Sequence, residues 1–94
     1  MGMFVTLPFK FNLSDYVLLI RINTVGAGRR FHVTPVTDSS NSKIYGSYIF
    51  LAIDGRVQYA DGPAEADALL ISSLESVLSA YEKKSLPFVY ANNR

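Results

Sequence analysis

The sequence predicts an α+β domain, in which an antiparallel meander sheet of about five strands carries one C-terminal helix on one face. Two observations support this two-layer sandwich. Five strand-like segments follow one another before residue 62, with no helical period between them. The single helical period comes afterwards, in residues 63–84. Consecutive strands without an intervening helix usually pair as antiparallel neighbours. The length of 94 residues predicts a single domain over 1–94.

The first predicted strand covers residues 3–11. Its odd positions are all apolar, whereas Thr6, Pro8 and Lys10 occupy even positions. This two-residue period is typical of a strand with one buried face. Because Pro8 has no amide proton, the strand belongs at a sheet edge or contains a bulge. Residues 12–15 then supply a turn.

The second and third strands are predicted at residues 16–23 and 30–37. In both, apolar side chains recur at every second position. Gly26 and Gly28 lie between them, and glycine tolerates the positive φ that a hairpin loop requires. Pro35 indicates a kink or an edge within the third strand.

The fourth and fifth strands form the best-defined predicted hairpin. They cover residues 44–53 and 56–60, and the dipeptide Asp54-Gly55 between them suits a two-residue type I′ turn. Such a turn sets the register of the two strands. The predicted pairs are Ile53 with Arg56 and Leu51 with Gln58 on one face, and Ala52 with Val57 and Phe50 with Tyr59 on the other.

The helix is predicted to begin at Pro63, because proline suits the first helical position. Acidic residues follow in its first turn, and Lys83 and Lys84 complement the opposite end of the helix dipole. Pro87 prevents continuation, and residues 88–90 could add a final strand or cover an edge. The apolar arc expected to pack on the sheet contains Ala66, Leu69, Leu70, Leu74, Val77, Leu78 and Tyr81. The outward side carries small residues that let another backbone approach closely: Ala68, Ser72, Ser76 and Ser79.

Composition excludes several classes of protein. Hydrophobic residues make up 49% of the chain and charged residues 18%, which excludes a disordered polyampholyte. Cysteine is absent, which excludes a disulfide scaffold and is compatible with the cytoplasm, the expected location. The longest apolar-rich run, residues 44–53, is too short to span a membrane. The start Met1, Gly2, Met3 resembles a cloning remnant, so we expect the natural chain to begin at Met3.

No arrangement of residues typical of catalysis is present, and we expect no enzymatic activity, no cofactor and no metal. His32 is the single histidine, and no carboxylate is spaced to orient it. Ser39 and Ser40 lack the Gly-x-Ser-x-Gly frame of a hydrolase nucleophile. The aspartates that could ligate a metal each lie in a predicted turn, which accounts for them without one: Asp15, Asp38, Asp54 and Asp61.

The predicted hairpin contains more apolar residues than one helix can cover. If Phe50 and Ala52 face the helix, then Tyr45, Ile49, Leu51 and Ile53 point the other way. Leaving such side chains in water loses stability and favours aggregation. The chain could cover this surface itself, pair with a second copy or bind another protein. We therefore expect a small protein-binding module, an adaptor or inhibitor of a larger complex, that acts through an apolar sheet face or edge.

Single-stranded nucleic acid is the alternative partner. Residues 1–60 contain six Lys and Arg against three Asp, whereas residues 61–94 contain five acidic residues against three basic ones. The segment from Gly26 to Arg30 resembles an anion-binding nest followed by two guanidinium groups. A sheet face with arginines and tyrosines could hold phosphates and stack bases. The residues predicted for this role are Arg21, Arg29, Arg30 and Tyr48.

Overall fold

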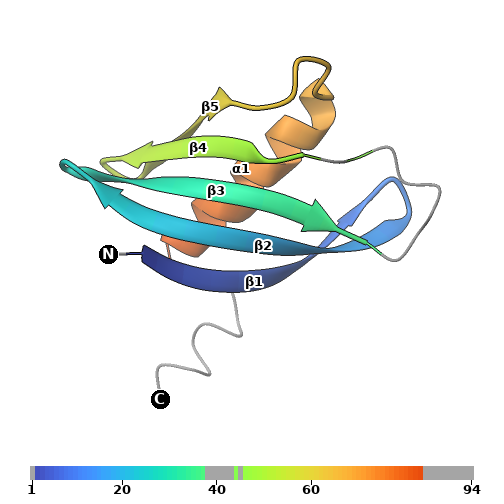
Figure 1. Cartoon of the computed structure of the whole chain (residues 1–94), viewed down its shortest axis with the longest axis horizontal. Helices are drawn as coiled ribbons and strands as arrows, with labels where there is room; N and C mark the ends of the chain where they lie inside the picture. Colours follow the sequence, from blue (N-terminus) through green and yellow to red (C-terminus); the bar gives the residue numbers. More distant parts are fainter. Residues whose placement is uncertain (1, 38–43, 45, 84–94) are drawn as a thin grey trace.

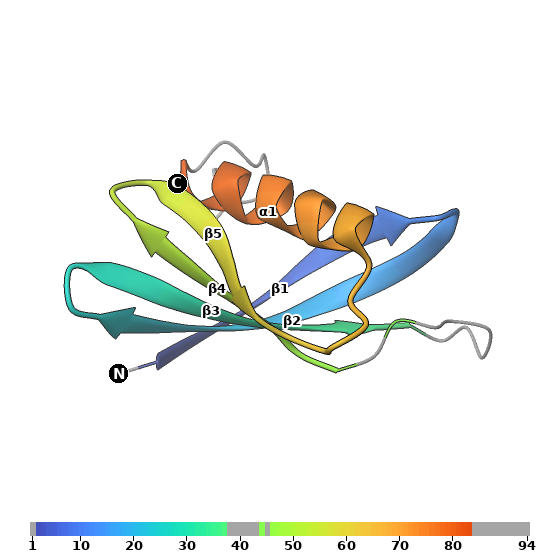
Figure 2. The ribbon, with the colours of Figure 1, turned by 90° about the horizontal axis from the view of Figure 1, so that it is seen from above.

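The computed structural model describes residues 2–37, 44 and 46–83, and it confirms the α+β class. Five antiparallel strands form one sheet in the order β1-β2-β3-β4-β5, and a single helix packs on it (Figure 1). Figure 2 shows that the sheet is strongly twisted and that the helix lies over one side of it. We call this side the inner face and the opposite side the outer face. The elements are β1 (Gly2–Phe11), β2 (Ser14–Val25), β3 (Gly28–Val36), β4 (Tyr48–Ile53), β5 (Arg56–Asp61) and α1 (Ala68–Glu82).

Two of the hairpins, β1–β2 and β4–β5, have two-residue turns in which both residues have positive φ. The β4–β5 turn has φ of 55° at Asp54 and 78° at Gly55, as the predicted type I′ turn requires. The β1–β2 turn is built in the same way by Asn12 and Leu13, with φ of 50° and 64°. Because this turn is shorter than predicted, Ser14 and the next residue already belong to β2. Such turns match the right-handed twist of the strands that they join.

All four predicted pairs of the β4–β5 hairpin are confirmed. The strand itself is shorter than expected, since β4 begins at Tyr48 and not at residue 44. A bulge between Ile49 and Phe50 places Ile49 opposite Asp61, while Phe50 lies opposite Tyr59. The predicted final strand at residues 88–90 lies outside the described residues.

The two strand prolines occupy positions that need no ladder hydrogen bond. Pro8 lies in β1, which is an edge strand, as predicted. Pro35 lies in β3, inside the sheet, but pairing between β3 and β4 ends at Val33 and Tyr48. Pro35 therefore pairs with β2 alone, so this end of β3 is locally an edge.

The core lies between the inner face and α1. Phe31 and Phe50 are fully buried at its centre. The helix contributes Leu70, Leu74 and Leu78, which recur at every fourth residue and are also buried. Burial of each such side chain stabilises the fold by about 1.5–3 kcal/mol. The inner face is therefore covered by the helix of the same chain.

The helix begins five residues later than predicted. Asp67 is the N-cap, and its carboxylate accepts hydrogen bonds from the backbone N–H groups of Leu69 and Leu70, at 2.7 and 3.4 Å. Pro63 belongs to a preceding turn, in which its carbonyl accepts from the N–H of Ala66. The predicted start at Pro63 is wrong. The Asp67 carboxylate accepts hydrogen bonds from free N–H groups of the first helical turn, and it therefore caps the helix at residue 67. Leu69, expected in the packed arc, is 72% exposed.

Candidate functional site

The outer face carries a broad apolar surface. Figure 2 shows α1 on the other side, and no helix or strand of the described residues covers the outer face. Side chains alternate along each strand, so the inner face of the sheet takes one set and the outer face the other. The large apolar residues that remain exposed on it are Phe4 (74%), Val17 (47%), Leu19 (42%), Val25 (51%), Val36 (44%) and Ile53 (54%).

Three of the four predicted partner-binding residues lie together on this face. Ile49, Leu51 and Ile53 alternate along β4 with the buried inner-face residues Phe50 and Ala52. Ile49 and Leu51 are half-buried by the neighbouring strands, and Ile53 is exposed. The fourth predicted residue, Tyr45, lies outside the described residues. In the described part of the chain, α1 therefore covers the inner face only, and the β4 row of the outer face has no helix over it.

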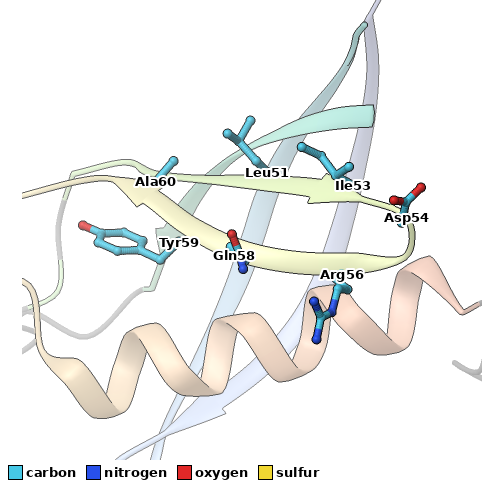
Figure 3. Close-up of a pocket in the computed structure, with 7 residues that line it drawn as sticks. All are labelled: Leu51, Ile53, Asp54, Arg56, Gln58, Tyr59 and Ala60. Atoms are coloured by element: carbon cyan, nitrogen blue, oxygen red, sulfur yellow. The ribbon is translucent and has the colours of Figure 1, made fainter. Parts of the chain in front are cut away.

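A shallow depression lies beside this β4 row. Its volume is about 430 Å³, and Figure 3 shows the residues that line it. Leu51 and Ile53 project from β4 in the same direction, and Ala60 of β5 points the same way. The lining residues are Leu51, Ile53, Asp54, Arg56, Gln58, Tyr59 and Ala60. The depression therefore combines an apolar β4 wall with polar and basic groups of β5 and with the acidic Asp54 of the turn between the two strands.

Exposed cations flank the apolar β4 row. Arg30 of β3 lies opposite Leu51, and Arg56 of β5 lies opposite Ile53. Arg21 of β2 is also exposed, and its guanidinium carbon lies 5.5 Å from the centre of the Phe4 ring. Within the described residues, none of these three arginines forms an ion pair.

The acidic residues of the outer face lie at strand ends and in a turn. Asp54, in the β4–β5 turn, lines the depression beside Ile53 and Arg56. Asp15, at the start of β2, is the cross-strand partner of Lys10 and offsets its charge. Asp61, at the end of β5, accepts a hydrogen bond from the N–H of Gly62 at 2.8 Å. The centre of the face, around Arg30, is therefore positive.

The sheet separates the residues predicted to bind nucleic acid. Arg21 and Arg30 lie on the outer face, in agreement with the prediction. Tyr48 is 3% exposed and belongs to the core, so its assignment to a base-stacking surface is wrong. Arg29 lies on the inner side, where its guanidinium is 3.5 Å from the Glu82 carboxylate. Tyr16 of β2 is likewise buried and offers no base-stacking surface.

The segment from Gly26 to Arg30 serves a structural purpose in this fold. Gly26 has φ of 58° in the β2–β3 turn. A Cβ on Gly28 would collide with the carbonyl oxygen of Ala52, so glycine permits the close approach of β3 and β4. The depression beside this turn, of about 370 Å³, also receives the carboxylates of Asp54 and Glu82. The negative charges of these two carboxylates make the depression unfavourable for binding an anion.

Among the described residues, the candidates for catalysis or metal binding do not converge. His32 is half-buried on the outer face, between Arg21 and Ile49 on the neighbouring strands. Across residues 2–37, 44 and 46–83, no group of three or more potential metal ligands occurs. Ser39 and Ser40 lie outside the described residues.

The small-residue side of α1 forms a groove with β5. The groove has a volume of about 470 Å³ and contains Ser72, Ser76 and Ser79. Glu75 lies among them, and its carboxylate accepts a hydrogen bond from the N–H of Tyr59 at 3.0 Å. This contact occupies an outward-facing amide of the edge strand β5 and makes the edge less available to another strand. Sequence analysis missed it, although Glu75 stands out as the charged residue on a serine-rich side.

Comparison of the chain with protein-family models, with curated proteins and with solved structures finds no match. In the described part of the chain, α1 is too short to cross a membrane. The functional conclusions therefore depend on the geometry of the outer face.

Proposed function

We propose that this protein is a small, non-enzymatic protein-binding module that docks a partner on the outer face of its sheet. The proposal depends mainly on one observation. The described chain covers the inner face with α1, whereas the outer face exposes apolar side chains from β1 to β4. Extended exposed apolar surfaces on small proteins mark sites of association. An adaptor or inhibitor role in a larger complex suits a single domain of this size.

The magnitude of the available burial supports a specific contact. Six large apolar side chains on this face are between 42% and 74% exposed. Full burial of such side chains contributes about 1.5–3 kcal/mol each, so burial of what remains exposed contributes about 5–9 kcal/mol in total. Association costs about 4–15 kcal/mol in lost translational and rotational freedom. Apolar contact alone is therefore marginal, and polar contacts from the same face must add to it.

The proposal leaves two kinds of protein partner, a second copy of this chain or a different protein. We also propose that the partner is met in the cytoplasm, because the chain contains no cysteine and needs no oxidising compartment.

The experiment compares a face variant with a matched control. The face variant carries Leu51→Lys and Ile53→Lys, and the control carries Leu69→Lys, which alters an exposed apolar residue of α1. Each immobilised protein is exposed to a lysate of the source cells, and retained proteins are quantified by mass spectrometry. Light scattering over a range of concentrations measures self-association of the same three proteins.

We expect the wild type and the Leu69→Lys control to retain the same partner or to form the same dimer, and the face variant to lose it. Circular dichroism checks that all three proteins are folded. Equal retention by the face variant and the wild type, with the fold intact, would place the interaction elsewhere and refute the proposal.

A further inference from the structure

We infer that the occupant of the outer face is an acidic amphipathic helix of another protein. This inference rests on the proposed function and specifies the chemistry and conformation of the partner. The observations that carry it are the apolar row of Ile49, Leu51 and Ile53 on β4, and the exposed arginines on the strands at either side, Arg30 and Arg56.

The conformation follows from what a sheet face offers. The strands on either side of β4 already pair with it, so its outer face presents side chains and no backbone hydrogen bonds. A segment that docks there must satisfy its own backbone groups, and an α-helix does so within one segment. The same sheet already accepts a helix on its inner face. The row from Ile49 to Ile53 spans about 13 Å, which corresponds to about two and a half helical turns.

The charge follows from the residues beside this row. Arg30 and Arg56 lie on opposite sides of β4 and are exposed without a described ion-pair partner. A helix whose apolar stripe covers Leu51 would direct its flanking side chains toward β3 and β5, where Arg30 and Arg56 are exposed. Glutamate or aspartate at those flanks would form charge-assisted hydrogen bonds with arginine. These contacts supply the polar contribution that apolar burial alone lacks.

A second copy of the chain fits this face less well. In a two-fold symmetric dimer the same patch meets itself, so the central arginines of one copy would approach those of the other. The carboxylates of Asp15 and Asp61 lie at strand ends and that of Asp54 in the β4–β5 turn, so none of the three is a cross-strand neighbour of Arg30.

Single-stranded nucleic acid would also bring negative charge. The apolar side chains that β4 places on this face, however, are aliphatic: Ile49, Leu51 and Ile53. The large exposed aromatic residue on the described outer face is Phe4, at the edge, and Arg21 already lies over its ring. Bases need flat aromatic platforms on which to stack. The face therefore suits apolar side chains of a protein better than bases.

The test uses a displayed library of 16-residue peptides. Each has a helical scaffold with aliphatic residues at every third and fourth position, and its flanking positions are randomised among Glu, Gln and Lys. The library is selected in parallel on the wild type, on a charge-reversed variant with Arg30→Glu and Arg56→Glu, and on Leu51→Lys. A labelled oligothymidylate is titrated against the same proteins at low and moderate salt.

We expect peptides selected on the wild type to favour Glu over Lys at the flanks by at least about fivefold. On the charge-reversed variant the preference should invert, and an acidic peptide from the first selection should bind about tenfold more weakly. Leu51→Lys should give no enrichment. These three results together support the inference.

The contrary outcomes separate the inference from the proposed function. Neutral or basic flanks on the wild type, with enrichment still lost in Leu51→Lys, would overturn the acidic partner and leave the docking face in place. Equal enrichment on Leu51→Lys and the wild type would overturn both. No enrichment on the wild type would overturn the helical partner, and the lysate and light-scattering comparison then decides the docking face. Oligothymidylate binding that is tighter than peptide binding and is lost in the charge-reversed variant would assign the face to nucleic acid. A concentration-dependent dimer that Leu51→Lys dissociates would assign it to a second copy.

Discussion

A lysine placed on either of two adjacent residues of β4 distinguishes the two faces of the sheet. Leu51 is half-buried on the outer face, whereas its neighbour Ala52 is 2% exposed and points into the core. In Leu51→Lys the aliphatic part of the new side chain can follow the surface while its ammonium group stays in water. We expect a loss of about 0.5–1.5 kcal/mol in the free energy of unfolding. For a domain of this size, each 1 kcal/mol lowers the melting temperature by about 4–8 °C.

The same substitution at Ala52 has a different consequence. The lysine side chain would enter the space between the sheet and α1, where the core is filled by Phe50 and the helix leucines. It would both overpack the core and remove a charge from water, which costs several kcal/mol. Domains of this kind have total stabilities of about 5–15 kcal/mol. We expect Ala52→Lys to be largely unfolded, or to melt at least about 20 °C below Leu51→Lys.

Thermal and urea unfolding followed by circular dichroism measure both effects. If Leu51 faces outward and Ala52 faces the core, the two variants must differ greatly in melting temperature, although the substituted residues are neighbours in one strand. If Leu51→Lys unfolds the protein as Ala52→Lys does, the outer face is already enclosed by this polypeptide. The docking surface would then not exist.

Two further predictions test the helix and its ion pair. Asp67→Ala should lower the free energy of unfolding by about 1 kcal/mol, because it removes the N-cap of α1. The control Glu65→Ala should change this free energy by less than about 0.5 kcal/mol. Equal effects of the two substitutions in urea unfolding would contradict the observed helix start. Arg29→Gln should cost only about 0.2–1 kcal/mol, because the Arg29 side chain is 42% exposed in its pair with Glu82. The Arg29 effect should shrink in high salt, and a loss as large in 1 M salt as in 0.1 M salt would show that charge pairing is not its cause.

Much of the candidate site could be predicted because side chains alternate strictly along a strand. The Asp54-Gly55 turn determines the register of β4 and β5, so it also determines that Ile49, Leu51 and Ile53 share a face. The same rule could have excluded Tyr48 from the outer face, because Tyr48 lies two residues before Phe50 and therefore points to the same side of the strand. It could also have separated Arg29 from Arg30, because adjacent strand residues point to opposite faces.

Other features of the site depend on residues far apart in the chain. The hydrogen bond from Tyr59 to Glu75 and the ion pair of Arg29 with Glu82 each join a strand to the helix. No local pattern indicates them, because they arise only when α1 packs diagonally under the sheet (Figure 1). The late start of the helix has a similar origin, since Pro63 and Asp67 are both acceptable first-turn residues in isolation.

The amino-acid order alone determined the class of fold, the hairpin register and the set of β4 side chains that point the same way. Those properties depend on turn chemistry and on the two-residue period, which act over a few neighbouring positions. Tertiary packing decided where the helix begins, that Arg29 pairs with Glu82 of the helix, and that the cations beside Leu51 remain exposed. These depend on where a distant helix comes to lie, because burial and charge pairing are properties of assembled surfaces.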